Sequence, residues 1–357
     1  MDWKQWKLPQ FISQFRDEIG IDLGTANTLV YVKGRGIVIN EPSVVAVNEK
    51  TGRVVAVGNT AKKMLGRTPA HITAVRPLVD GVVSNFEVTE EMLAYFIRKA
   101  ERGSKNKFLR PRVVVGVPYG ITNVERRAVI DATRNAGARE VYIIEEPMSA
   151  AIGIRLPIHD AVGNMIIDVG GGTTEIAVIS LSGIVRAKSL RIAGDTLNND
   201  IVSYIKEEFK ILLGEKTAED LKMLIGSVHT PDEPMEATVR GRDLVTGLPR
   251  EVIITDTDIR EAIGSSIATL VDSVKEVIET TPPEIISDIM HRGIVLVGGG
   301  SLVHGMQKLL EDELKIPIHL EEEAMTAVVR GMGVILEDIS VYQDILIDNE
   351  NELPPIA

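Results

Sequence analysis

One short pattern occurs twice in the chain and constrains its fold more than any other feature. Residues 21–28 read IDLGTANT and residues 167–174 read IDVGGGTT, so that Ile, Asp, Gly and a final Thr stand in register. A short apolar run follows each copy, and Gly-Ile-Val comes after it at 36–38 and at 183–185. The repeat predicts two copies of one strand–turn–strand unit, and therefore two related lobes.

The residues around the first turn indicate which side chains face the same way. Apolar residues alternate from Ile19 to Leu23, which is typical of a strand and places Asp22 on its opposite face, with Gly24 opening the turn. Asp168 has the same position in the second copy. Two unrelated hairpins with similar glycine-rich turns are the alternative, and the shared aspartate argues against it.

Strands and helices alternate through the rest of both halves, which predicts an α/β fold. The expected strands are Val113 to Val117, Val141 to Ile144 and Ile294 to Val297, and the expected helices start near Thr122, 196, Thr217, Thr257 and Leu302. Inserted subdomains are predicted at about 47–80 and about 195–255. The expected domains are an amphipathic segment (1–18), a first lobe (19–160), a second lobe (161–325), and a helix returning to the first lobe with an acidic tail (326–357).

Composition excludes several classes of protein. The chain has 357 residues, 44% of them hydrophobic, which suits a globular protein of two domains. A net charge of −12 argues against a surface built to bind nucleic acid. The lack of cysteine excludes disulfides and thiolate chemistry. No apolar run approaches the ~18 residues of a spanning helix, and no signal peptide is evident, so we expect a cytoplasmic protein.

Two glycine-rich turns are candidates for binding phosphate, because such turns present consecutive backbone N–H groups. Facing each other across a cleft, they would hold the β- and γ-phosphates of a nucleotide. Asp22 and Asp168 are candidate ligands of a hydrated Mg²⁺, and capping of the turns is their alternative role. The turn residues are Gly24, Thr25, Ala26 and Asn27 in the first copy, and Gly170, Gly171, Gly172 and Thr173 in the second.

A third glycine-rich turn, Gly298, Gly299, Gly300 and Ser301, lies between a predicted strand and a predicted helix, as nucleotide-binding turns do. The pattern GxxxxGK[ST] is absent, and GGGSLVHG at 298–305 does not satisfy GxGxxG. Phosphate binding is therefore expected to use the paired hairpins.

Hydrolysis of a bound nucleotide would need a group that orients or deprotonates water. Glu146 is the candidate, because a buried strand and a proline-initiated helix would aim its carboxylate at the cleft; Glu145 is the alternative. Thr173 is a second candidate for contact with this water. Glu219 and Lys222 share a helix face and are candidates for ribose and adenine contacts, or else form an ordinary surface ion pair.

Several long segments resemble the MreB family of bacterial actins, within the actin/Hsp70/sugar-kinase superfamily. They include IDLGTANTLVYVKGRGIVINEPSVVAV, GITNVERRAVIDATRNAGAREVYIIEEPM, IDVGGGTTEIAVISLSGIV, VRGRDLVTGLPR and TPPEIISDIMHRGIVLVGGGSLVHGM, and the resemblance extends over about residues 19–340. Ser149 departs from the family, which usually has alanine there.

The resemblance implies an actin-like fold of two duplicated RNase H-like lobes around a nucleotide cleft, with ATP or ADP and Mg²⁺ bound there. It also implies weak ATPase activity, filaments of paired protofilaments on the inner face of the cell membrane, and partners in cell-wall elongation that maintain rod shape. In this family Glu146 and Thr173 would be the hydrolytic pair.

Three other functions remain open from the residues alone. An Hsp70-type chaperone shares the ATPase core but would need a substrate domain after it. A sugar or acetate kinase would need an acceptor-binding segment, and none is evident. A scaffold that binds ATP without hydrolysing it is the third.

Two segments predict direct binding to anionic lipid. Residues 1–16 place Trp3, Trp6, Phe11, Ile12 and Phe15 among basic residues, which is typical of an interfacial segment. Between Arg98 and Arg112 seven basic residues surround Phe108 and Leu109 at a predicted loop tip, where the family has a membrane-inserting loop. An N-terminal arm packed on its own domain and a solvated basic loop are the alternatives.

Overall fold

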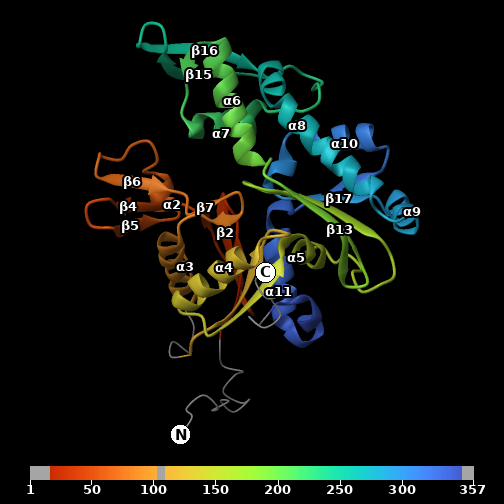
Figure 1. The fold of residues 1–357 in the computed structure, drawn as a ribbon. Helices are drawn as coiled ribbons and strands as arrows, with labels where there is room; N and C mark the ends of the chain where they lie inside the picture. Colours follow the sequence, from red (N-terminus) through yellow and green to blue (C-terminus); the bar gives the residue numbers. More distant parts are fainter. Residues whose placement is uncertain (1–16, 103–108, 348–357) are drawn as a thin grey trace.

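The computed structural model describes residues 17–102 and 109–347, which form two lobes, each built on a five-stranded sheet (Figure 1). The first sheet has the order β10-β9-β1-β2-β3 and the second has the order β13-β12-β11-β17-β18. The strands are β1 (Glu18–Leu23), β2 (Asn27–Val32), β3 (Gly36–Pro42), β9 (Arg112–Val117) and β10 (Glu140–Glu145), then β11 (Asn164–Val169), β12 (Thr174–Ser180), β13 (Gly183–Leu190), β17 (Ile294–Val297) and β18 (Ile318–Leu320).

The two sheets have the same topology, which confirms the fold predicted from the repeat. In each sheet the first three strands form an antiparallel meander, and two parallel strands follow beside the first. Even the irregularity in the second hairpin recurs, between Val30 and Tyr31 in one lobe and between Val178 and Ile179 in the other. The molecule is therefore a duplicated α/β fold, with Asp22 and Asp168 at equivalent positions on β1 and β11.

Helices cover both sheets and complete the apolar cores. Buried residues of α3, including Met92 and Phe96, share one apolar core with residues of β1 and β9. Buried residues of α8 from Ile259 to Val277 contribute to the core of the second lobe. A third core lies around α5 and α11 and includes residues of both sheets. The helices are α3 (Phe86–Ala100), α4 (Asn123–Asn135), α5 (Glu146–Gly153), α8 (Asp256–Glu279), α9 (Pro283–Arg292), α10 (Met306–Leu314) and α11 (Ala327–Glu337), with 3₁₀ turns η2 (Gly299–Leu302), η3 (Ala324–Thr326) and η4 (Ile339–Ile345).

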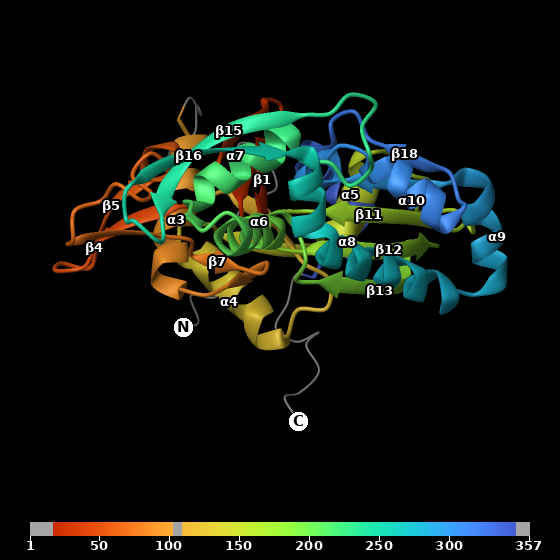
Figure 2. The same cartoon turned by 90° about the horizontal axis from the view of Figure 1, so that it is seen from above.

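Each lobe carries an additional small sheet. In the first lobe, β5-β4-β6 stands beside α2, and the short pair β7 and β8 follows; in the second, β14-β15-β16 packs with α6 and α7. Figure 2 shows β4 and β5 at one end of the molecule and α9 and α10 at the other. The elements are β4 (Val45–Asn48), β5 (Arg53–Val57), α2 (Asn59–Lys62), β6 (Ile72–Val75), β7 (Leu78–Val79) and β8 (Val82–Val83), then α6 (Gly194–Glu208), β14 (Ile211–Leu212), α7 (Glu215–Ile225), β15 (Glu236–Asp243) and β16 (Pro249–Thr255).

Three helices begin at residues other than those predicted. Helix α8 begins at Asp256, because Thr255 and not Thr257 forms the capping box with Asp258. Helix α7 begins at Glu215, ahead of Thr217. Helix α10 begins at Met306, since the glycine-rich segment before it forms the 3₁₀ turn η2 instead of a first α-helical turn. The capping box predicted at Thr122 is present.

Helices α5 and α11 cross at close range next to the first sheet. A Cβ atom on Gly331 of α11 would overlap the carbonyl oxygen of Ser149, and one on Gly153 of α5 would overlap that of Ala327. The Ser149 hydroxyl donates to the carbonyl of Val328 at 2.8 Å, so the serine that departs from the family pattern joins these two helices. Glycine is required at both crossing positions because the backbones themselves are in contact.

We expect Gly331→Ala to lower the free energy of unfolding by about 1–3 kcal/mol, because the added methyl group forces α5 and α11 apart. Urea unfolding followed by circular dichroism measures this change. The matched control is Gly264→Ala in the exposed face of α8, where nothing lies within 4 Å of a new Cβ. This control gains up to about 1 kcal/mol from helix propensity. Equal stability of the two variants would contradict the packing described here.

Candidate nucleotide site

A cavity of about 820 Å³ lies between the two lobes and is lined by both glycine-rich turns of the repeat. It also brings together the carboxylates and the third turn that the sequence singled out. The predicted residues among its lining are Asp22, Gly24, Thr25, Ala26, Asn27, Glu146, Asp168, Gly170, Gly171, Gly172, Thr173, Glu219, Lys222, Gly298, Gly299 and Gly300. Ser301 is buried behind this wall, where its hydroxyl donates to the carbonyl of Gly298 at 2.5 Å.

The two phosphate-binding candidates contact each other at the bottom of the interlobe space. A Cβ atom on Gly171 would lie 2.5 Å from the Cβ of Ala26, and one on Gly172 would lie 2.5 Å from Oγ1 of Thr25. The backbone N–H of Gly81 donates to the same Thr25 hydroxyl at 2.9 Å. A side chain at Gly171 or Gly172 would overlap the first turn and force the two turns apart. The close approach therefore explains why the second turn has glycine at these positions.

Carbonyl groups of the first turn are bound by residues behind it. The Ser43 hydroxyl donates to the carbonyl of Gly24 at 2.5 Å, and the Ser43 N–H donates to that of Ala26 at 3.0 Å. Thr28 holds Ser43 through a buried contact of 2.8 Å between the two hydroxyl oxygens. Because the carbonyl oxygens are occupied in this way, the turn is suited to an anion.

The second turn is held in the same manner by the start of α6. The N–H groups of Gly194 and Asp195 donate to the carbonyls of Gly170 and Gly171 at 3.1 and 2.8 Å. The N–H of Gly170 donates to the carbonyl of Thr173 at 2.9 Å, which closes the turn. The two turns are thus supported by different elements, Ser43 in the first lobe and α6 in the second. In both turns these elements bind backbone carbonyl groups.

Four carboxylates gather beside the turns, of which Asp168 and Glu175 are buried and Asp22 and Glu146 are half-buried. Burial, with a contribution from Asp168, raises the pKa of Asp22 to about 7, and burial raises the pKa of Asp168 to about 7. Burial and the charges of Asp22, Glu175 and Asp168 raise the pKa of Glu146 well above its usual value. Burial also raises the pKa of Glu175 to about 7. Negative charge concentrated in this way is stabilised when a cation binds.

The carboxylates are better suited to Mg²⁺ than to a metal ion whose ligands are all protein side chains. Within the described ranges, no three His, Asp or Glu side chains are grouped so as to hold a metal ion. Mg²⁺ is usually held by one or two carboxylates, with water and substrate phosphates as its other ligands. Asp22 and Asp168, from equivalent strands of the two lobes, offer such a pair.

The structure distinguishes the two adjacent glutamates at the start of α5. Glu146 is the first residue of the helix and lines the cavity, whereas Glu145 is the residue before it and is not among the lining residues. Burial raises the pKa of Glu145, and the nearby Arg126 lowers it. The geometry therefore favours Glu146 as the group that faces a bound nucleotide.

Glu219 and Lys222 have partners other than each other. Lys62, from the first-lobe insert, forms an ion pair with Glu219 at 3.2 Å, and Lys62 also lines the cavity. The Lys222 ammonium donates to the carbonyl of Gly194 at 2.7 Å, and burial lowers its pKa. Glu219 and Lys222 therefore contact other residues at the cavity wall, instead of forming the surface ion pair that was the alternative prediction from the sequence.

A second cation joins the lobes beside this point. Arg76, which follows β6 of the first lobe, forms ion pairs with Asp195 of α6 at 2.9 Å and with Glu215 of α7 at 2.6 Å. Sequence reasoning missed Lys62 and Arg76, because both lie in an insert without a recognisable motif. Their basic side chains are the only local signal, and it is shared with many surface residues.

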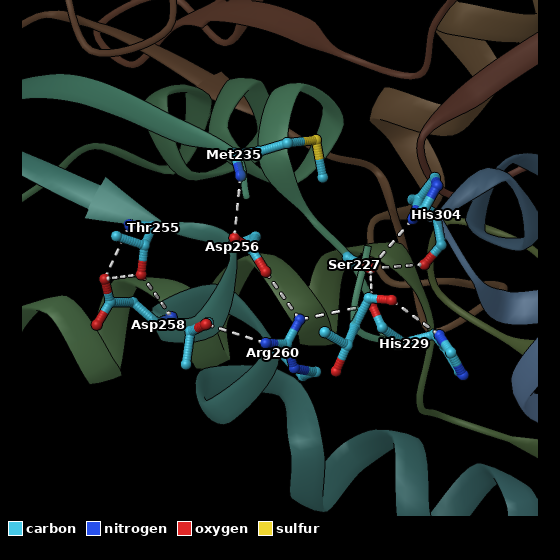
Figure 3. A network of polar contacts seen from close by, with 10 residues as sticks. Ser227, His229, Met235, Thr255, Asp256, Asp258, Arg260 and His304 are labelled. Atoms are coloured by element: carbon cyan, nitrogen blue, oxygen red, sulfur yellow. Dashed lines mark hydrogen bonds and ion pairs between the residues drawn. The ribbon is translucent and has the colours of Figure 1, made fainter. Parts of the chain in front are cut away.

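Polar contacts fix the walls of the cavity near Met235 and His304, both of which line it (Figure 3). The Ser227 hydroxyl lies 3.2 Å from Nδ1 of His304, and the two residues also form a parallel backbone bridge. The N–H of Met235 donates to the Asp256 carboxylate at 3.1 Å, and Arg260 donates to that carboxylate at 2.9 Å. These contacts join the segment after α7 to η2 and α8.

Most residues of the predicted membrane-binding segments lie outside the described residues, namely Trp3, Trp6, Phe11, Ile12, Phe15 and Phe108. Leu109 is described and is half-buried rather than exposed at a loop tip. Among residues 17–102 and 109–347, no helix has the length and apolar character needed to cross a bilayer.

The chain matches the family model described as MreB/Mbl protein over residues 16–344. It is 48% identical over 349 residues to the cell shape-determining protein MreB of Escherichia coli (strain K12), covering 96% of this chain and 100% of that protein. It is also 48% identical over 325 residues to the cell shape-determining protein Mbl of Bacillus cereus (strain ATCC 10987 / NRS 248), covering 91% of this chain and 97% of that protein.

A solved structure supports the same assignment. The crystal structure of MreB5 of Spiroplasma citri bound to ADP has a TM-score of 0.87 and 37% sequence identity, and the match covers 92% of this chain and 98% of that one. The same protein bound to AMPPNP has a TM-score of 0.86. The duplicated lobes around one cavity thus form an actin-like fold. The chain belongs to the MreB/Mbl family, whose curated relatives are cell shape-determining proteins.

Proposed function

We propose that this protein binds and slowly hydrolyses Mg-ATP, and that it polymerises into membrane-associated filaments that organise cell-wall elongation and so maintain rod shape. The observation that carries the proposal is the pair of glycine-rich turns in contact across the cavity, next to four carboxylates that are buried or half-buried. Its relative MreB5 binds ADP and AMPPNP, which supports a nucleotide in this cavity.

The residues of the cavity divide the work of binding. Backbone N–H groups of the two turns hold phosphate oxygens, since the carbonyls of Gly24, Ala26, Gly170 and Gly171 accept hydrogen bonds from other segments. Glu219 accepts hydrogen bonds from ribose hydroxyls, and Lys222 lies beside the base. The turn from Gly298 to Gly300 supports the adenosine. Gly298 is required there because its φ is 85° and a Cβ atom would overlap the carboxylate of Asp168.

Hydrolysis depends on holding one water in line with the γ-phosphate. Glu146 accepts a proton of this water as general base, and the hydroxyl of Thr173 fixes its orientation. Asp22 and Asp168 would hold Mg²⁺, which would neutralise charge on the phosphates. Slow turnover is expected, because no cationic side chain is assigned to the γ-phosphate in this arrangement.

Membership of the family and the two-lobed architecture support filament formation. If the two lobes close on a nucleotide, hydrolysis of that nucleotide changes the angle between them. A head-to-tail contact between copies of the chain that does not form a closed ring produces a filament. Self-association into paired protofilaments is therefore part of the proposal. Partners in cell-wall elongation are inferred from the cell shape-determining relatives.

Ultracentrifugation with simultaneous measurement of phosphate release tests this function. We expect most of the protein to pellet at tens of micromolar with Mg-ATP, little without nucleotide, and phosphate to appear on the same timescale. Buffer with EDTA in place of Mg²⁺ is the control. Pelleting without phosphate release would indicate a scaffold that only binds ATP. A monodisperse monomer that transfers phosphate to an added sugar or acetate would indicate a kinase.

Membrane association places the protein at the cytoplasmic side of the cell membrane and has its own test. We expect the protein to co-sediment with anionic liposomes despite its net charge of −12, because aromatic and basic residues of 1–16 interact with the interface. Deletion of residues 1–16 lowers the bound fraction, and Phe108→Ser with Leu109→Ser lowers it further. Neutral liposomes are the control. Unchanged binding of the combined variant would contradict both assignments.

A further inference from the structure

Two basic side chains of the first-lobe insert reach across the cavity to helices of the second lobe. Lys62, the last residue of α2, forms an ion pair with Glu219 of α7 at 3.2 Å. Arg76 follows β6 and contacts two carboxylates, Asp195 of α6 at 2.9 Å and Glu215 of α7 at 2.6 Å. We refer to these five residues as the interlobe clasp. The clasp joins the insert of the first lobe to the N-terminal parts of two helices of the second lobe.

The acidic partners in the clasp also shape the nucleotide site. The backbone N–H of Asp195 donates to the carbonyl of Gly171, in the second glycine-rich turn, at 2.8 Å. Lys62, Asp195 and Glu219 all line the cavity, and Glu219 is the residue proposed to bind ribose. Movement of α6 and α7 away from the first lobe would therefore move the walls around the phosphates and the sugar.

The ion pairs of the clasp are exposed enough to open and protected enough to act together. The exposed fractions of its side chains range from 24% for Asp195 to 47% for Glu215. Single ion pairs at this level of exposure contribute little and are weakened by salt. A further interlobe pair, Arg191 with Asp80 at 3.9 Å, is left out of the clasp because the Arg191 side chain is 72% exposed. The strength of the clasp should therefore depend on ionic strength.

The lobes are joined in a different way around α5 and α11. There one apolar core contains buried residues of both sheets, such as Ile144 of β10 and Ile166 of β11. Figure 1 shows α2 and α7 in the upper part of the molecule, with α5 and α11 below them. Apolar packing is not subject to the screening that weakens ion pairs. This arrangement favours separation of the lobes at the clasp, while α5 and α11 remain packed as the joint.

We propose that the interlobe clasp sets the rate at which ADP leaves the cavity, because its ion pairs must break before the lobes separate. The inference rests on the proposed function, in which a nucleotide lies between the lobes. Lys62 and Arg76 are positioning residues in this scheme, since they hold α6 and α7 and do not contact the reacting atoms. Weakening the clasp should thus accelerate release of ADP more than it changes its association.

Displacement of a fluorescent ADP analogue by excess unlabelled ADP, followed by stopped flow, measures this rate. Arg76→Gln is expected to raise the dissociation rate constant about 3–10-fold at low ionic strength, because it removes two ion pairs. Lys62→Gln removes one pair and should raise it about 2–3-fold. Raising KCl from about 50 to about 500 mM should accelerate release from the original protein, with a smaller effect on Arg76→Gln. The association rate constant should stay within about twofold.

Glu215→Gln separates the clasp from a local effect on the cavity wall. Glu215 is not among the lining residues, and its ion pair is with Arg76. Alone, this substitution should accelerate release about twofold, but by less than about 1.5-fold in an Arg76→Gln background, because its effect requires Arg76. Lys275→Gln is the matched control. It removes an ion pair within the second lobe, with Glu313 at 2.7 Å, and should leave the rate constant and its salt dependence unchanged.

The outcomes separate the clasp from the proposed function. If Arg76→Gln releases ADP at the original rate, or if Glu215→Gln accelerates release equally with and without Arg76, the clasp does not control release. Failure of the unaltered protein to bind ADP would overturn the proposed function as well. Clasp-dependent release of ADP by a protein that does not hydrolyse ATP would support the clasp and remove the ATPase assignment.

Discussion

Glu146→Ala is expected to slow phosphate release by at least about 10²-fold, while nucleotide affinity changes by less than about twofold. The reason is that different groups of the cavity bind the nucleotide and act on the water. In the proposed function the backbone of the two glycine-rich turns holds the phosphates, whereas the Glu146 carboxylate acts only on water. Its raised pKa, caused mainly by burial, brings its basicity closer to that required of a general base near neutral pH. Single-turnover release of phosphate and titration with a fluorescent nucleotide measure the two quantities separately.

The neighbouring residue provides a matched control. Glu145→Ala removes a carboxylate one position earlier, where the side chain makes no hydrogen bond to the cap of α5 and does not line the cavity. This variant should hydrolyse ATP at close to the original rate. A loss of rate in Glu145→Ala as large as that in Glu146→Ala would remove the basis for choosing between them. Parallel loss of binding and hydrolysis in Glu146→Ala would exclude a catalytic role for it.

Asp168→Ala should abolish most of the gain in ATP affinity that Mg²⁺ provides, and it should have little effect on affinity in EDTA. Asp168 is one of two carboxylates at equivalent positions of the two lobes, and the proximity of such groups to phosphate is unfavourable without a cation. In EDTA no loss of ATP affinity is expected, since the variant has one negative charge fewer beside the phosphates. Isothermal titration in the two buffers measures the difference.

The duplicated residue allows a second comparison. Asp22→Ala should show the same loss of Mg²⁺ dependence, whereas Asp160→Ala on the exposed surface should behave like the original protein. Equal weakening of binding with Mg²⁺ and with EDTA, in either site variant, would mean that the carboxylate supports the turn and not the metal.

Local patterns predicted the elements of the fold well because each strand and turn depends mainly on nearby residues. Ile294–Val297 is a strand with the predicted bounds, and the capping box at Thr122 starts α4. Where two caps compete, as Thr255 and Thr257 do before α8, the choice depends on which threonine has a carboxylate three residues later in the correct geometry. The helix start predicted at Leu302 was wrong because Gly305 has a φ of 81°, outside the helical region, so α10 begins only after it.

The sequence by itself determined the two-lobed architecture and the location of the two glycine-rich turns that line the cavity. Two copies of one pattern must form the same hairpin, since the same alternation and the same glycines direct the backbone in both. The tertiary structure alone decided which of Glu145 and Glu146 faces the cavity. It also decided that Lys62 pairs with Glu219, 157 residues away, and that Glu175 reaches the backbone of Tyr119 in the other lobe. Such contacts join segments that are far apart in the sequence and share no pattern that would predict their pairing. They form only when the lobes pack together.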